Sequence, residues 1–259
     1  MTRTLLRLVL PVLLFAALVW FWEWAVGFWQ VKKFVLPAPS AILAAFRTDG
    51  ASLLASAAAT AKTTLAAFAL AAVSGVALAA LFASSRLAEA MLSPYAVILQ
   101  VTPVVAIAPL VVIWVGLDNA WLAVLILAWI VAFFPVLANA TAGLKAADPN
   151  LRDLFRLYRA TPLQTFRRLL VPSSLPYLLA GLKTAGGLAL IGAVVAEFAA
   201  ASGTSGGLAW RILEAGNRLQ IAKMFAALIL LALMGVLIYA ALSFLEWLLL
   251  RRWHGEVAR

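Results

Sequence analysis

Residues 145–176 read KAADPNLRDLFRLYRATPLQTFRRLLVPSSLP, a long basic and polar stretch in an otherwise apolar chain. Asp148 followed by Pro149 predicts one short helix, and Thr161 followed by Pro162 predicts a second. The cap oxygen accepts an orphan N–H, and proline has none to leave unpaired. Four apolar side chains share one face of the first helix: Leu151, Leu154, Phe155 and Tyr158. A short amphipathic helix of this kind fits a groove in a partner protein.

The rest of the chain has the composition of a polytopic membrane protein. Of its 259 residues, 66% are hydrophobic and 12% are charged, whereas soluble domains are about half apolar and about one-quarter charged. Six apolar stretches reach the roughly 20 residues that a bilayer requires. We expect an all-α fold in a single domain over residues 1–259. The predicted spans are 5–29, 57–83, 94–115, 121–143, 178–200 and 222–249.

The distribution of lysine and arginine predicts the orientation of these spans. With both termini in the cytosol, twelve basic residues lie inside, seven lie outside and Lys183 sits near a span boundary. This bias follows the positive-inside rule and explains the net charge of +10 without any contact to nucleic acid. We therefore expect a multi-pass protein of the cell membrane, with residues 145–176 facing the cytosol and the spans in contact with lipid.

Prolines mark two of the predicted spans. Pro94, Pro103 and Pro109 fall in the third span, which predicts either a bent span beside a pathway or a kinked packing helix, because proline frees backbone carbonyls. Pro135 falls in the fourth span and is expected to break it.

Other features lie at the borders of the spans or between them. Ser40 can start a short surface helix after the prolines at 37 and 39, and residues 208–219 predict another surface helix. Glu23 lies near the outer end of the first span, where we expect a wetted boundary residue.

Glu197 is the acidic residue placed deepest in a predicted span. Intramembrane charges usually face the interior of a helix bundle. Small residues precede Glu197 at steps of four, so a neighbouring helix can approach this face: Gly181, Ala185, Ala189 and Ala193. Glu197 is thus expected to face protein, where it either lines or gates a solute path, or pairs with a backbone group or a cation.

Gln100 and Asn139 are further polar residues within spans, and both solute contact and packing hydrogen bonds explain them. The sequence offers no site for chemistry. It has no cysteine, its one histidine is His254 in the tail, and no stretch reads G-x-x-x-x-G-K-[ST] or G-x-S-x-G. We expect no catalytic residue, no metal, no cofactor and no enzymatic activity.

The stretch at 145–176 resembles the cytoplasmic loop of ATP-binding-cassette importer permeases of the binding-protein-dependent type. Their signature is E-A-A, three residues, G, nine residues and I-x-L-P. Asp153 stands at the Glu, Pro172 at the Pro, and Arg159 at the Gly. The remaining positions match only in spacing or apolar type: Leu154, Phe155, Leu169 and Val171. Segments 101–117, 133–149 and 175–198 look like the nitrate, sulfonate and taurine branch of this family.

The resemblance implies a six-span permease that pairs with a second copy of itself, two cytosolic ATPase subunits and an extracytoplasmic solute-binding protein. The loop would be the coupling helix that docks on the ATPase, through Leu151, Asp153, Leu154, Phe155, Tyr158 and Arg159. Branch members carry nitrate or bicarbonate, sulfonates, and pyrimidine precursors of thiamine. The family's Gly supplies a left-handed turn, so Arg159 either adopts that strained conformation or the turn has a different backbone.

Two other functions are compatible with the residues. A secondary transporter driven by an ion gradient would use an intramembrane acid–base relay, for which Glu197 is one candidate. A membrane scaffold that transports nothing would need no such group.

Overall fold

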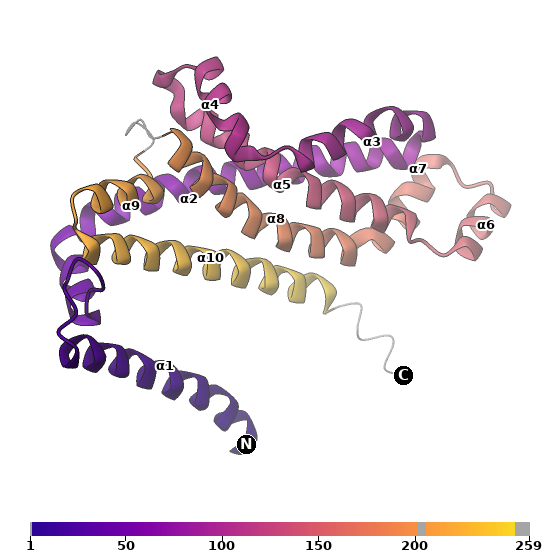
Figure 1. Ribbon diagram of the computed structural model, residues 1–259. Coiled ribbons are helices and arrows are strands. Elements are labelled where there is room, and N and C mark those ends of the chain that lie inside the picture. The colour runs from indigo at the N-terminus through magenta and orange to yellow at the C-terminus, as the bar shows by residue number, and fades with distance from the viewer. Residues whose placement is uncertain (1, 201–205, 252–259) are drawn as a thin grey trace. The chain divides into compact units, whose positions relative to one another are not determined.

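The computed structural model describes residues 2–200 and 206–251. His254 and residues 201–205 lie outside this range. Within it every regular element is helical (Figure 1). The elements are α1 (Thr2–Phe28), α2 (Pro39–Ser84), α3 (Arg86–Val101), α4 (Val104–Val115), η1 (Leu117–Asn119), α5 (Ala120–Lys145), α6 (Pro149–Leu157), α7 (Pro162–Thr165), η2 (Phe166–Leu170), α8 (Val171–Ala200), α9 (Leu208–Asn217) and α10 (Ile221–Leu250).

Length and composition identify the helices that can cross a membrane. Among the described residues five stretches qualify, carried by α1, α2, α5, the run from α7 to α8, and α10. The pair α3 and α4 makes a sixth if its two halves count as one span. The predicted spans all fall on these helices, although several helix boundaries differ from the expected ones.

Helix α2 is continuous over 46 residues. It joins the surface helix expected at Ser40 to the second predicted span, because no proline or other strong helix breaker follows Pro39. The carboxylate of Glu23 caps its start. The backbone N–H of Ser40 donates to Oε2 at 2.9 Å, and its hydroxyl donates to Oε1 at 2.7 Å. Glu23 is therefore more than the wetted boundary residue that we expected. A negative group at the start of a helix accepts a hydrogen bond from an unpaired backbone N–H and interacts favourably with the helix dipole.

The three prolines of the third predicted span do not act alike. The chain turns by 100° between α3 and α4, where Pro103 stands at the N-cap of α4. Pro94 and Pro109 lie inside the two helices. The expected span at 94–115 thus falls on two helices. Pro135, in contrast, lies within an unbroken α5, so our expectation of a break there was wrong.

The described residues pack into two compact units. One comprises residues 59–200 and 233–251, and its core is built by α5 against α8. The small-residue face of α8 is buried in this contact, as its four-residue spacing predicted. A Cβ on Gly181 would lie 2.7 Å from the Cβ of Asn139, and one on Gly192 would lie 2.9 Å from the Cα of Ala128. Glycine at these positions lets the two helices approach closely.

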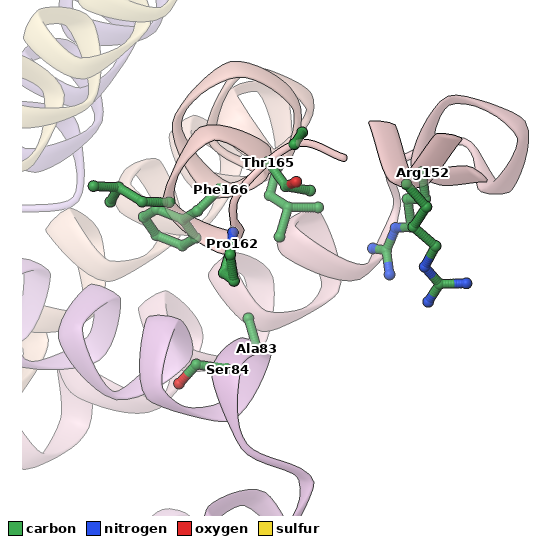
Figure 2. A pocket seen from close by; sticks show the side chains of 10 residues that line it. Ala83, Ser84, Arg152, Pro162, Thr165 and Phe166 are labelled. Carbon is green, nitrogen blue, oxygen red and sulfur yellow. The ribbon is translucent and has the colours of Figure 1, made fainter. Parts of the chain in front are cut away.

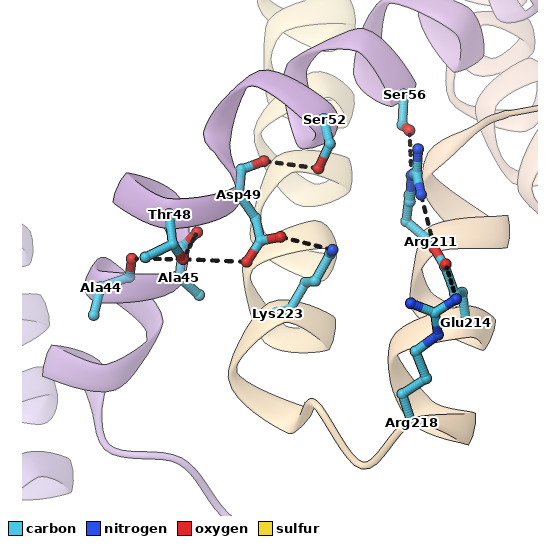
Figure 3. Close-up of polar contacts among 10 residues, drawn as sticks. All are labelled: Ala44, Ala45, Thr48, Asp49, Ser52, Ser56, Arg211, Glu214, Arg218 and Lys223. Atoms are coloured by element: carbon cyan, nitrogen blue, oxygen red, sulfur yellow. Dashed lines mark hydrogen bonds and ion pairs between the residues drawn. The ribbon is translucent and has the colours of Figure 1, made fainter.

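The other unit comprises residues 2–58 and 206–232. It holds α1, α9, and the first parts of α2 and α10. Polar contacts tie α2, α9 and α10 together (Figure 3). Lys223 Nζ lies 2.8 Å from Asp49 Oδ1, and Arg211 Nε donates to the hydroxyl of Ser56 at 3.0 Å. Arg211 also pairs with Glu214 at 2.7 Å. The helix predicted at 208–219 is present as α9, but it is not a surface helix, because its residues are buried or half-buried up to Gly216.

Candidate functional site

The start and the end of α6 follow from its sequence. Asp148 Oδ1 accepts the N–H of Asn150 at 2.8 Å, and Pro149 is the first helical residue. At the other end Arg159 has a φ of +52°. The N–H of Arg159 donates to Arg156 O, and the N–H of Ala160 donates to Phe155 O, both at 2.9 Å. This is a Schellman motif with an arginine in the left-handed position that glycine usually fills. Of the two conformations considered for Arg159, the structure therefore has the left-handed one.

After this turn the chain starts a new helix with a capping box. The N–H of Gln164 donates to Thr161 Oγ1, and the Gln164 side chain accepts from the N–H of Thr161. Pro162 follows the cap as predicted. The helix is not a separate short one, however, because it continues through the π-helical turn η2 into α8 and ends at Ala200. Single π turns inside α-helices are frequent at functional sites.

The apolar side chains of α6 are largely exposed. Leu151 and Leu154 are exposed, Phe155 is half-buried, and Tyr158 is 80% exposed. Leu157 is also 80% exposed, and our sequence reasoning missed it because it falls outside the i, i+3, i+4, i+7 pattern. The only signal for it was the residue type, a leucine at the end of a short amphipathic helix. Large exposed apolar patches on a polar element mark interaction surfaces.

The charged groups of α6 point in two directions. Asp153 and Arg156 pair with each other at 3.3 Å, and their side chains are 67% and 83% exposed. Arg152 is half-buried and donates to backbone oxygens of α5. Asp153 is therefore accessible to a partner, whereas Arg152 is directed toward its own chain.

A cleft of about 580 Å³ lies beside α6 (Figure 2). Arg152 and Arg156 line it from α6, and the end of α2 lines it with Ala83 and Ser84. The start of the next helix contributes Pro162, Leu163, Thr165 and Phe166. The cleft combines two guanidinium groups with apolar walls, so it can accept an acidic or amphipathic segment.

The three polar residues predicted within spans are not brought together. Glu197 is 2% exposed, and Thr60 donates to its Oε1 at 2.7 Å. Asn139 donates to the carbonyl of Pro135, one turn earlier on its own helix, at 2.8 Å. Gln100 is exposed and lines a cleft of about 310 Å³ at the bend between α3 and α4. Glu197 faces protein, as its small-residue face predicted.

No group of three or more potential metal ligands occurs in the part of the chain that the structure describes. The described clusters are ion pairs and hydrogen-bonded caps, which can hold helices or contact a partner.

Comparison with known proteins decides which of the considered classes applies. The family described as "binding-protein-dependent transport system inner membrane component" matches residues 71–254. The chain belongs to this family. It is the membrane-spanning permease subunit of an ATP-driven importer, located in the inner membrane with several passes.

Relatives of this permease extend over most of its length. A "Probable ABC transporter permease protein" of Haemophilus influenzae is 31% identical over 95% of this chain and 97% of its own. The riboflavin transport system permease protein RibX of Chloroflexus aurantiacus is 34% identical over 93% of this chain and 89% of its own. The formylaminopyrimidine transport permease protein ThiX of Halalkalibacterium halodurans is 38% identical over 61% of each chain.

A solved structure shows the same fold. The permease chain in a crystal structure of an amino acid ABC transporter with histidines superposes with a TM-score of 0.60 at 18% identity. The alignment covers 78% of this chain and 94% of that one.

Proposed function

We propose that α6 of this permease is the docking element for a cytosolic ATPase subunit, and that two such ATPases drive a dimer of the permease. The observation that supports this most is the exposed apolar surface of α6, formed by Leu151, Leu154, Leu157 and Tyr158. Phe155 underlies it, and Asp153 and Arg159 border it. ATP hydrolysis belongs to the partner, so the permease itself performs no chemical step.

The orientation that this role needs agrees with the charge pattern. Basic residues concentrate in 145–176 and near both termini, and the positive-inside rule then puts these segments in the cytosol. An extracytoplasmic solute-binding protein would deliver the solute to the opposite face. Both α2 and α10 run through both compact units, which supports one permease domain over the whole chain.

Docking is tested by changing Leu157 and Tyr158 together to Asp. Both side chains are 80% exposed, so the change spares the packing of α6. Burying their apolar surface contributes about 25 cal/mol per Å², and two buried carboxylates oppose it. We expect at least about a 100-fold weaker affinity for the ATPase, measured by co-purification and by titration in detergent.

Val35→Asp is the matched control for this experiment. Val35 is an exposed apolar residue on the connection between α1 and α2, and its change should leave the ATPase bound. Undiminished co-purification of the double variant would refute docking through α6.

We propose that the solute is small and polar, of the nitrate and sulfonate kind or of the pyrimidine kind. Relatives named for formylaminopyrimidine, aliphatic sulfonates, nitrate and bicarbonate support this range. Calorimetric titration of the solute-binding protein that works with this permease would distinguish these classes. Binding of none of them would reject the proposed range.

Gln100 is the proposed contact to the solute path. It is the one polar side chain among the residues that line the cleft at the bend between α3 and α4. Glu197 accepts a hydrogen bond from Thr60, so we assign it a role in holding α8 to α2. Asn139 bonds within its own helix, so we assign it no contact to the solute. Gln100→Trp should reduce transport and leave ATPase binding intact, whereas Val97→Trp, one turn away, should change neither. Normal transport by the Gln100 variant would remove this residue from the path.

A further inference from the structure

Arg152 connects α6 to the end of α5. Its Nη2 donates to the carbonyl of Leu144 at 2.9 Å and to that of Lys145 at 3.2 Å. Both carbonyls belong to the last turn of α5, where no further helical N–H can reach them. A guanidinium at this position also lies against the negative end of the helix dipole. The contact is thus a C-terminal cap of α5 that is supplied by α6.

Lys145 extends the connection to a third helix. Its backbone oxygen accepts from Arg152, and its ammonium group pairs with Glu89 near the start of α3. The three side chains line one cleft of about 610 Å³ together with Arg86. The helices α6, α5 and α3 therefore meet in one polar junction, which we call the Arg152 junction and define by Arg152, Lys145 and Glu89.

The other polar side chains of α6 make no comparable contact among the hydrogen bonds and ion pairs of the described residues. Asp153 and Arg156 pair with each other, and Asp148 caps the helix to which it is joined. With only nine residues, α6 is far shorter than a helix that is stable by itself in water. On either side, α6 is joined to the rest of the chain only by its N-cap, Asp148, and by the turn at Arg159. Its orientation against α5 thus depends on Arg152 and on the half-buried Phe155.

We propose that Arg152 is the positioning residue that transmits movement of the docked α6 to α5 and, through Lys145 and Glu89, to α3. This inference rests on the proposed docking of the ATPase on α6. Since α5 packs along α8 and α3 leads into the bend at Pro103, both recipients of the movement border the candidate path. Without the junction, α6 would move with the ATPase, but this movement would not be transmitted to α5 and α3.

The test compares Arg152→Gln, Arg152→Lys and the control Arg168→Gln, at an exposed arginine outside α6, in the complete importer, reconstituted in liposomes. Three quantities are measured: co-purification with the ATPase, ATP hydrolysis, and solute transported per ATP. We expect Arg152→Gln to bind the ATPase and hydrolyse ATP, but to transport about tenfold less solute per ATP, as the loss of a charge-assisted hydrogen bond suggests. Arg152→Lys keeps a donor and a charge, so it should restore part of the coupling. Arg168→Gln should transport like the unchanged protein.

A charge exchange tests the same junction without touching Arg152. Glu89→Lys places two like charges together and should reduce transport per ATP. Adding Lys145→Glu restores an opposite pair and should recover it, while the backbone oxygen of residue 145 is retained. This pair of variants decides the matter if Arg152→Gln does not fold.

Two results would overturn the inference. Unchanged transport per ATP in Arg152→Gln and in Glu89→Lys would show that the junction transmits nothing. Loss of ATPase binding in Arg152→Gln would make Arg152 a docking contact instead of a positioning residue. Failure of the docking proposal is seen separately, as continued ATPase binding by the Leu157 and Tyr158 double variant.

Discussion

The ammonium group of Lys183 on α8 lies 2.7 Å from a carboxylate oxygen of Glu246 on α10. It also lies 5.0 Å from the centre of the Tyr239 ring. Further along, Gly186 gives room to Leu242, and a Cβ on Gly235 would lie 3.3 Å from Leu190. These contacts set α8 and α10 antiparallel in one register.

A secondary transporter would also use an intramembrane ion pair, but the family of this permease assigns it to ATP-driven import. We therefore interpret the pair as a packing contact.

Reversal of one charge in this pair should destabilise the protein. The side chains of Lys183 and Glu246 are 25% and 28% exposed, so the cost of Lys183→Glu should be about 1 to 3 kcal/mol, below that of a fully buried pair. The midpoint of thermal unfolding in detergent measures it. The exchange of both charges, Lys183→Glu with Glu246→Lys, should recover most of the loss. A double variant as unstable as the sum of its parts would contradict a direct pair.

Close packing of α5 on α8 predicts a strong position dependence among the glycines of α8. Gly192→Ala should destabilise by about 1 to 3 kcal/mol, because the new methyl group would meet backbone of α5. Gly187→Ala is the matched control on the same helix, since nothing lies within 4 Å of its added Cβ. Control and variant are compared by thermal unfolding. Equal midpoints would argue against the close helix contact.

The left-handed backbone at Arg159 predicts opposite effects on stability and on binding. Arg159→Gly removes a strain of about 1 kcal/mol, so α6 should resist chymotrypsin cleavage after Tyr158 better than in the unchanged protein. Arg159→Val should be cleaved faster, because a β-branched residue fits this conformation poorly. If the Arg159 side chain contacts the ATPase, as we propose, the glycine variant also binds it more weakly. Unchanged binding would remove Arg159 from the docking surface.

The pH dependence of stability should depend in part on Glu214, which lies in α9 outside the membrane-crossing helices. Its hydrogen bond to Arg211, with the charges of Arg211, Arg218 and Lys223, holds the pKa of Glu214 below its ordinary value, although burial alone would raise it. Because the folded state binds this proton more weakly than the unfolded chain, the stabilisation is complete above the ordinary pKa. It is lost as pH falls through the lowered one.

Glu214→Gln removes this contribution. The variant should have a lower unfolding midpoint at neutral pH and a smaller further decrease on acidification. Asp118→Asn, at an exposed carboxylate in η1, is the control and should follow the unchanged protein. Parallel acid profiles of the Glu214 variant and the unchanged protein would show that this ion pair does not contribute.

Local signals in the sequence predicted the features that depend on neighbouring residues. Asp148 and Thr161 cap their helices because a cap needs only the next few backbone groups. The buried face of α8, ending at Glu197, follows from a four-residue repeat. Comparison with a family signature raised the left-handed turn at Arg159 as one of two possible conformations, and the structure has that one.

Features that depend on distant residues could not be predicted in this way. Lys183 and Glu246 are 63 positions apart, and Lys145 and Glu89 are 56 apart. The sequence around either residue of a pair carries no signal that identifies the other residue. Prolines were equally ambiguous, since Pro103 coincides with a sharp bend and Pro135 with none. Whether a missing N–H breaks a helix depends on what packs around it.

The length of α2 locates the water boundary along the chain. At 1.5 Å per residue, its 46 residues rise about 69 Å, more than twice the hydrocarbon thickness of about 30 Å. Charged residues in α2 end at Lys62, and the remainder to Ser84 is about one bilayer long. The charge pattern therefore predicts that the hydrocarbon begins near Lys62, and we expect the preceding half of α2 in the headgroups and the aqueous phase. Thr60 and the Glu197 carboxylate it contacts lie at that border, where an acidic group is far less costly than at the bilayer centre.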